Sequence, residues 1–228
     1  MSISVAKNLA LFDLDNTLLS SDSDYLWGEF ACENNIVNAT EFRKKNNEYM
    51  QQYRQGVLDA DEFVAFQLNV LTKFPRETLN NFYKEYFDNK IKPVILPKGI
   101  DLVQRHLQNG DLCALVSATN TFITAPIARY FKIPYLICTT AEQNMENGNY
   151  TGECIGKKSF REGKIFRVEQ FLQNYGLFWG SFEKTYFYSD SFNDLPLLNK
   201  VSNPVAVNPD AKLLEAAQKN NWTILDLR

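Results

Sequence analysis

Hydrophobic and polar positions follow three different patterns along this chain. Leu9-Ala10-Leu11-Phe12 is a short apolar run of the kind that forms a buried strand. From about Asp22 to Lys92 the apolar residues recur at helical spacing, with little strand signal. Beyond Pro93, apolar runs of strand length alternate with segments of helical periodicity. The pattern therefore predicts a sheet-forming core interrupted by a helical segment.

The helical stretch divides into four predicted helices. Asp59 followed by Glu62 indicates a capping box, and Gly56 breaks the pattern just before it. The other helix starts are predicted at Ser21 or Asp22, at Thr40, and at Pro75, which suits a first helical turn. Because the connections are short, we expect a small bundle.

The second half of the chain predicts an α/β fold. Strands are expected over residues 112–117, 135–139, 185–189, 204–207 and 222–225, with helices over 99–108, 119–131, 163–175 and 210–219. Asn147-Gly148 is a turn signal before a hairpin strand at 150–154. Such alternation favours a Rossmann-like, doubly wound parallel sheet covered on both faces. Residues 1–18 and 96–228 would form this core, with 19–95 as the inserted helical domain.

Composition narrows the possible partners. The 228 residues are 45% hydrophobic and 14% aromatic, which is ample for a core, and the net charge of −3 argues against nucleic acid. No apolar run is long enough for a membrane span, and the N-terminus does not resemble a signal peptide. With four cysteines that show no close pairing, we expect a cytoplasmic protein. The single His106 rules out a histidine-rich metal site, and we expect it to be a structural or a surface residue.

The candidate chemistry begins at Asp13-Leu14-Asp15-Asn16-Thr17, directly after the first strand. Ligands and catalytic groups gather beyond the carboxyl ends of such strands. Taken alone, these residues are also ordinary turn and cap residues. The same ordinary interpretation holds singly for Ser117, Lys164, Asp190 and Asp194.

Together these side chains fit phosphoryl transfer. That reaction requires an attacking oxygen, a divalent cation and donors for the phosphoryl oxygens. A carboxylate can act as the nucleophile, and Mg²⁺ favours one or two carboxylates plus substrate phosphate. Ser117 with the neighbouring backbone N–H of Ala118, and the positive charge of Lys164, would hold the phosphoryl group.

The order of these motifs resembles the haloacid dehalogenase superfamily of phosphatases. The segments are DLDNT, LVSAT with Ser117, REGK with Lys164, and DSFND with Asp190. The helical insert and the hairpin NGNYTGECIG resemble the phosphoserine-phosphatase-like branch, whose insert is a cap. The segments DSDYLW, SATNTFITAPIA and YFYSDSFNDLPLL are most similar to a bacterial subgroup described as histidinol-phosphatase-like.

The resemblance implies a role for each matching position. Asp13 would be the nucleophile, Asp15 the general acid and base, and Lys164 the phosphate-binding cation. Asp13, the backbone carbonyl of Asp15, and Asp190 would bind Mg²⁺. Supporting roles fall to the remaining matches: Thr17 for the loop, Ser117 and Ala118 for phosphate, Asn193 for substrate or phosphate, and Asp194 for orienting Lys164 or a metal-bound water.

The resemblance implies that the substrate is a small phosphomonoester. It leaves the identity of the leaving group undetermined. Val64-Ala65-Phe66-Gln67 stands where phosphoserine phosphatases carry an arginine, which weakens phosphoserine as substrate. Asp22 or Asp24 could bind an amine, as in histidinol phosphate, while Asp22 could also simply cap a helix. Trp27, Tyr53 and Arg54 could line the pocket or belong to the bundle. Phosphoserine hydrolysis and phosphotransfer through the same aspartyl phosphate are the alternatives, and a monomer or homodimer is expected.

Overall fold

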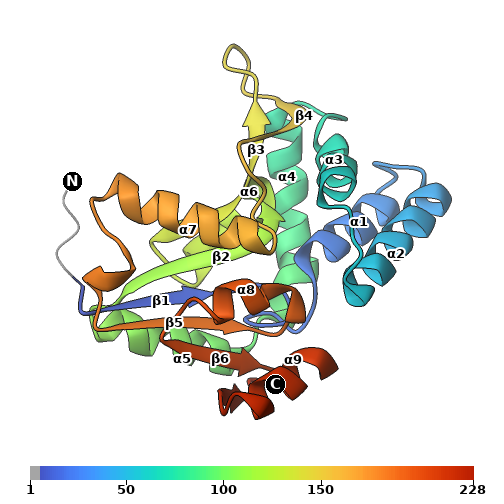
Figure 1. Ribbon diagram of the computed structural model, residues 1–228. Coiled ribbons are helices and arrows are strands. Elements are labelled where there is room, and N and C mark those ends of the chain that lie inside the picture. The colour runs from blue at the N-terminus through green and yellow to red at the C-terminus, as the bar shows by residue number, and fades with distance from the viewer. Residues whose placement is uncertain (1–5) are drawn as a thin grey trace.

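A seven-stranded sheet forms the centre of the molecule, with strand order β4-β3-β2-β1-β5-β6-β7 (Figure 1). The computed structural model describes residues 6–228, so the first five residues of the predicted segment 1–18 lie outside it. All neighbouring strands are parallel except β3 and β4, which form an antiparallel hairpin. The strands are β1 (Asn8–Phe12), β2 (Leu112–Asn120), β3 (Tyr135–Gln143), β4 (Tyr150–Ile155), β5 (Lys184–Ser189), β6 (Asn203–Val207) and β7 (Thr223–Leu225).

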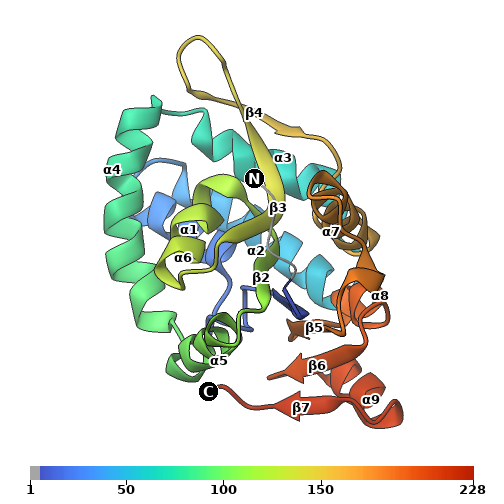
Figure 2. The same cartoon turned by 90° about the vertical axis from the view of Figure 1, so that its left-hand side faces the viewer.

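Helices cover both faces of this sheet, as the alternating sequence pattern predicts (Figure 2). One face packs against α5 (Pro97–Gln108) and α6 (Thr121–Tyr130). The other packs against α7 (Glu162–Asn174), α8 (Leu195–Leu198) and α9 (Ala211–Lys219). In β1, Ala10 and Phe12 face the first layer, whereas Leu9 and Leu11 face the second. This alternation of side chains along the strand confirms a doubly wound α/β fold.

Four further helices lie beside the sheet: α1 (Ser23–Glu33), α2 (Ala39–Gln55), α3 (Ala60–Leu71) and α4 (Arg76–Tyr86). The chain leaves the core and returns to it at one place, where Leu19 and Ile95 form an antiparallel bridge. We call residues 19–95 the helical insert. Its core is continuous with that of the α5–α6 layer, through a cluster in which Trp27 contacts the rings of Tyr86 and Phe122.

Local chemistry explains most of the helix boundaries. Asp22 caps α1 by accepting a hydrogen bond from Tyr25 N, and Asp59 caps α3. The cap of α2 is Asn38, two residues before the predicted Thr40. Helix α4 is followed directly by a π-helical turn (Phe87–Ile91) and a 3₁₀ turn (Lys92–Val94). Short 3₁₀ turns also occur at Trp179–Ser181 and Phe192–Asp194.

Other sequence expectations concern single residues and the membrane. His106 is structural: it is buried and contacts Asp111 and the hydroxyl of Tyr188. Trp27 belongs to the hydrophobic core, since only 1% of it is exposed. None of the helices within residues 6–228 is both long and apolar enough to cross a membrane.

Candidate active site

The predicted site residues meet at the carboxyl edge of the sheet. Strand β1 lies between β2 and β5, and its end delivers Asp13. Ser117 lies in β2 and Asp190 follows β5. This is the point where the strand order reverses, with β2 and β3 on one side of β1 and β5 to β7 on the other. Ligand sites of open α/β sheets form at such switch points.

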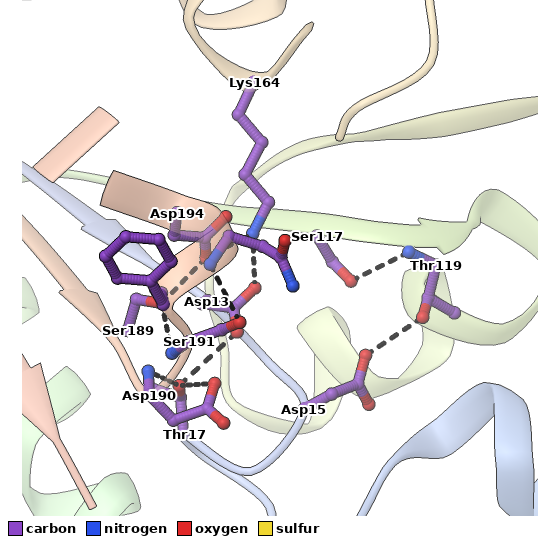
Figure 3. A network of polar contacts seen from close by, with 12 residues as sticks. Asp13, Asp15, Thr17, Ser117, Thr119, Lys164, Ser189, Asp190, Ser191 and Asp194 are labelled. Carbon is purple, nitrogen blue, oxygen red and sulfur yellow. Dashed lines mark hydrogen bonds and ion pairs between the residues drawn. The ribbon is translucent and has the colours of Figure 1, made fainter. Parts of the chain in front are cut away.

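Lys164 is the charged centre of the site (Figure 3). Its Nζ lies 2.8 Å from Asp13 Oδ1 and 2.6 Å from Asp194 Oδ2. Asp194 is held in turn by the Ser189 hydroxyl at 2.7 Å. Burial lowers the pKa of Lys164, but the carboxylates of Asp13 and Asp194 outweigh this and keep the pKa above its usual value. Lys164 is therefore a fixed cation beside Asp13.

Asp13 and Asp190 share the hydroxyl of Thr17. Thr17 Oγ1 lies 3.4 Å from Asp13 Oδ2 and 3.4 Å from Asp190 Oδ1, and it accepts a hydrogen bond from Asp190 N at 3.1 Å. Burial raises the pKa of Asp13 to about 7, with Lys164 opposing the shift. Burial, and then the charges of Asp13 and Asp194, hold the pKa of Asp190 well above its usual range. These two neighbouring carboxylates would be stabilised by a cation.

The donor set fits Mg²⁺ better than a softer metal. Within residues 6–228 no group of three or more His, Cys, Asp or Glu side chains is arranged to hold a metal ion. Two carboxylates, here Asp13 and Asp190, are what Mg²⁺ commonly uses beside substrate phosphate and water. Thiolate or imidazole ligands, which suit zinc, are not among the side chains gathered around Thr17.

Asp15 is fixed by two donors from different segments. Its Oδ1 accepts a hydrogen bond from Ser23 N at 2.6 Å, and its Oδ2 accepts one from the Thr119 hydroxyl at 2.9 Å. Burial and the nearby charge of Asp22 raise the pKa of Asp15 to about 7. A carboxyl group with a pKa near neutrality can both give and take a proton, as a general acid and base must.

A cavity of about 50 Å³ extends from Asp13 and Asp15 toward the helical insert. Two further carboxyl groups, Asp22 and Asp24, line it, and burial raises the pKa of each to about 7. Its other walls are largely aromatic and aliphatic: Tyr49, Met50, Tyr53, Leu58, Phe63, Val64 and Phe160. The lysines in the wall are Lys164 and Lys158, and Lys158 forms an ion pair with Asp61 of α3. The cavity is thus acidic and aromatic.

The remaining predicted residues lie at or near this cavity with distinct contacts. Ala118 lines it, whereas Ser117 is fully buried and its Oγ accepts a hydrogen bond from Thr119 N at 3.1 Å. Asp22 both caps α1 and lines the wall. Both polar atoms of the Asn193 amide form hydrogen bonds. Its Oδ1 accepts from Arg161, and its Nδ2 donates to the carbonyl of Tyr53.

Three residues that were not predicted from the sequence contact these side chains. Thr119 holds Asp15, Ser189 holds Asp194, and Arg161 holds Asn193. Ser189 had a signal in sequence, because it is the residue directly before Asp190. Tyr53 does line the cavity, whereas Arg54 lines an outer groove.

Comparison with known proteins assigns the family. The model of haloacid dehalogenase-like hydrolases matches residues 10–199, so the chain belongs to this family. It is therefore a phosphatase of the haloacid dehalogenase class, with the α/β fold of that class.

Among its relatives is a histidinol-phosphatase of Neisseria meningitidis. The two chains are 44% identical over 222 residues, which cover 97% of this chain and 100% of that one. A phosphoserine phosphatase of Mycobacterium tuberculosis is 28% identical, with 96% of this chain and 70% of that one covered. A solved Bordetella pertussis protein of unknown function superposes with a TM-score of 0.92 at 44% identity, covering 98% and 100% of the two chains. A substrate-bound phosphoserine phosphatase superposes at 0.67 and 18% identity over 96% of this chain and 92% of that one, which shows a shared fold.

Proposed function

We propose that this protein is a Mg²⁺-dependent phosphomonoesterase whose substrate carries a cationic leaving group, with histidinol phosphate as the leading candidate. The observation that carries the proposal is the wall of the cavity, where Asp22 and Asp24 face the same space as Asp13 and Asp15. An ammonium or imidazolium group would neutralise these carboxylates and stack on the aromatic rings around them. The relative of Neisseria meningitidis is described as a histidinol-phosphatase.

The first chemical step of the proposed mechanism uses Asp13 and Asp15. Asp13 Oδ attacks phosphorus as the bond from phosphorus to the ester oxygen breaks, and Asp15 donates its proton to the leaving alkoxide. Lys164, 2.8 Å from Asp13, keeps a positive charge beside the phosphoryl oxygens throughout. Ser117 and the N–H of Ala118 donate to those oxygens. The product of this step is an alcohol and an aspartyl phosphate on Asp13.

The second step regenerates the enzyme. Asp15, now ionised, takes a proton from water, and the water oxygen attacks phosphorus. The bond from phosphorus to Asp13 Oδ breaks and releases inorganic phosphate. A bound Mg²⁺ would supply positive charge at the phosphoryl oxygens, and Asp13, Asp190 and the carbonyl of Asp15 would hold it. Asp194 keeps Lys164 in place through the contact of 2.6 Å.

In this proposal residues 19–95 act as a cap that selects the leaving group, while residues 1–18 and 96–228 carry the chemistry. The cap supplies the acidic and aromatic wall beside Asp22. We propose a cytoplasmic enzyme, monomeric or homodimeric, that acts on a small metabolite and contacts neither nucleic acid nor membrane.

Phosphoserine is the alternative substrate, since one relative carries that description. A free carboxylate on the substrate would need a cationic partner. The residues that line the described cavity include no arginine, and the Lys158 side chain is already paired with Asp61. The cavity therefore favours an amino alcohol phosphate without a carboxylate.

A phosphate-release screen with Mg²⁺ tests the proposal. It compares histidinol phosphate, phosphoethanolamine, phosphoserine, sugar phosphates and nucleotides. We expect kcat/KM for histidinol phosphate to exceed that for phosphoserine by at least about tenfold, since a buried unpaired carboxylate costs on the order of 1–3 kcal/mol.

Asp13→Asn should abolish hydrolysis of every ester, whereas Asp101→Asn, on the exposed side of α5, should leave it unchanged. Substantial turnover by Asp13→Asn, or a preference for phosphoserine, would contradict the proposal. Transfer of phosphate to an added alcohol in place of water would identify a phosphotransferase.

A further inference from the structure

Five residues join the end of α2 to the core beside the candidate active site. The Arg161 guanidinium donates to Asn193 Oδ1, at 3.2 Å from Nε and 3.0 Å from Nη2, and also to the carbonyl of Gly56. Asn193 Nδ2 donates to the carbonyl of Tyr53 at 3.2 Å, and the Tyr53 hydroxyl donates to Ser191 Oγ at 3.0 Å. We call this set of contacts the clasp. It connects the helical insert to the core through side chains of the core's own catalytic segments.

One residue of the clasp, Tyr53, lines two separate spaces. The cavity beside Asp13 holds about 50 Å³, enough for a few water molecules and well below the few hundred Å³ typical of a ligand pocket. An outer groove of about 470 Å³ is lined by Gly56, Asn193 and Asp190. Met50 and Tyr53 line both spaces. A substrate must therefore widen the cavity, and displacing Tyr53 would join it to the groove.

Arg161 is held in an unusual backbone conformation for this contact. Its φ of 50° and ψ of −122° form a combination that glycine adopts far more readily than other residues. It precedes α7, whose first turn carries Lys164. Its partner Asn193 adjoins Asp194, and Asp194 binds Lys164. The Arg161 guanidinium thus contacts both the helical insert and Asn193. Asn193 is next in the chain to Asp194, which positions Lys164.

We propose that Arg161 is a positioning residue that holds the insert closed over the leaving group, and that substrate and product pass where Tyr53 separates the cavity from the groove. This proposal rests on the proposed function for its substrate. The closed arrangement brings Tyr53 and the acidic wall to the leaving group. Weakening the clasp raises the population of an open form, and the apparent affinity falls in proportion to the closed fraction.

Two readouts on Arg161→Lys test this, because lysine keeps the charge but loses the planar fork. The first is amide hydrogen exchange over residues 54–58, which should accelerate about tenfold while exchange in the core strands is unchanged. The second compares KM for histidinol phosphate with KM for acetyl phosphate, whose leaving group is too small to reach the insert. The first KM should rise about twofold, because it grows only as the closed fraction falls, whereas kcat and the second KM should stay unchanged.

Controls separate the clasp from a general loss of structure. Arg161→Gly, which suits the backbone conformation, should show the same exchange and the same split in KM. Arg43→Lys, which alters an exposed contact with Glu29 on the outer side of the insert, should show neither. A parallel rise of both KM values would mean that Arg161 binds phosphate directly, and would overturn the proposal. Unchanged exchange over residues 54–58 would overturn it too. If the wild type hydrolyses no ester but exchange over residues 54–58 still accelerates in Arg161→Lys, the role of Arg161 in the clasp is supported and the proposed function is contradicted.

Discussion

The acidic residues of the cavity make the stability of the fold depend on pH. Asp24 is buried in the first turn of α1, and its polar contact in the structure is Asn120 Nδ2, at 3.4 Å. Burial, and then the charge of Asp15, raise its pKa from 3.8 to about 7. In the unfolded chain the Asp24 carboxyl ionises near its ordinary pKa. Folding with Asp24 ionised therefore costs free energy that folding with Asp24 protonated does not.

The higher pKa of Asp24 in the folded chain determines how the free energy of unfolding changes with pH. The contribution of Asp24 to the free energy of unfolding is fully present below about pH 4 and is lost as the pH rises through about 7. Asp24→Asn removes this titration. At pH 8 in EDTA the variant should be more stable than the wild type, by an amount on the order of 1–4 kcal/mol. Melting temperatures from pH 4 to 8 measure this, with Asp101→Asn as control. Parallel curves for wild type and Asp24→Asn would refute the expectation.

At the level of single residues, sequence predicted which acidic side chains would meet at the edge of the sheet. Asp13, Asp15 and Asp190 stand directly beyond strands, and parallel strands present their carboxyl ends at one edge. Thr119 and Arg161 were not found, because their partners Asp15 and Asn193 lie far away in the chain. A threonine in a strand or an arginine before a helix has no local feature that reveals a distant contact.

At the level of elements, the insert depends on close approach between helices. Gly28 in α1 faces α2, and an added Cβ there would lie 2.6 Å from a ring carbon of Phe42 and 3.0 Å from Asn46 Nδ2. Both neighbours are buried, so they have little room to move. Gly28→Ala should therefore lower the free energy of unfolding by about 1–3 kcal/mol, as overpacking usually does.

Gly99 in α5 offers a matched comparison within a helix. An added Cβ there would lie 3.3 Å from a terminal methyl group of Leu18, a contact that needs an adjustment of only a few tenths of an ångström. Alanine is favoured over glycine in helices by about 1 kcal/mol, so Gly99→Ala should be neutral or slightly stabilising. Urea denaturation of the two variants provides the measurement. Equal stability of Gly28→Ala and the wild type would show that α1 and α2 can separate without cost.

Element boundaries were predictable where side chains cap the backbone and less so elsewhere. Asp22 and Asp59 were recognisable as caps because their side chains accept from backbone N–H groups two or three residues later. The helical periodicity up to Lys92 agrees with the helical turns after α4, but nothing in the sequence indicated their π-helical form. Pro93 lies inside the 3₁₀ turn that follows.

For the whole molecule, the alternating pattern predicted the layers but not the strand order. Apolar runs in β1, β2 and β5 indicated buried parallel strands, and helices between them required both faces to be covered. That β1 pairs with both β2 and β5 is a long-range property of the sheet. It is this pairing that brings Asp13 between Ser117 and Asp190. The insertion of residues 19–95 leaves the pairing of β1 intact, because Leu19 and Ile95, at the two ends of the insert, lie side by side.

The final prediction concerns how Mg²⁺ stabilises the folded chain. Asp13 comes from β1 and Asp190 from β5, and these segments meet only in the folded state. A cation that binds both carboxylates therefore binds the folded form and not the unfolded one, and at a concentration one hundred times its Kd it adds about 2.7 kcal/mol to the free energy of unfolding. Thermal melting in EDTA and in increasing Mg²⁺ should show a rise in Tm that follows the occupancy of the site. Asp190→Asn should weaken this rise strongly, whereas Asp101→Asn should retain it. A Tm that is unaffected by Mg²⁺, or an equal rise in Asp190→Asn, would exclude Asp190 as a ligand.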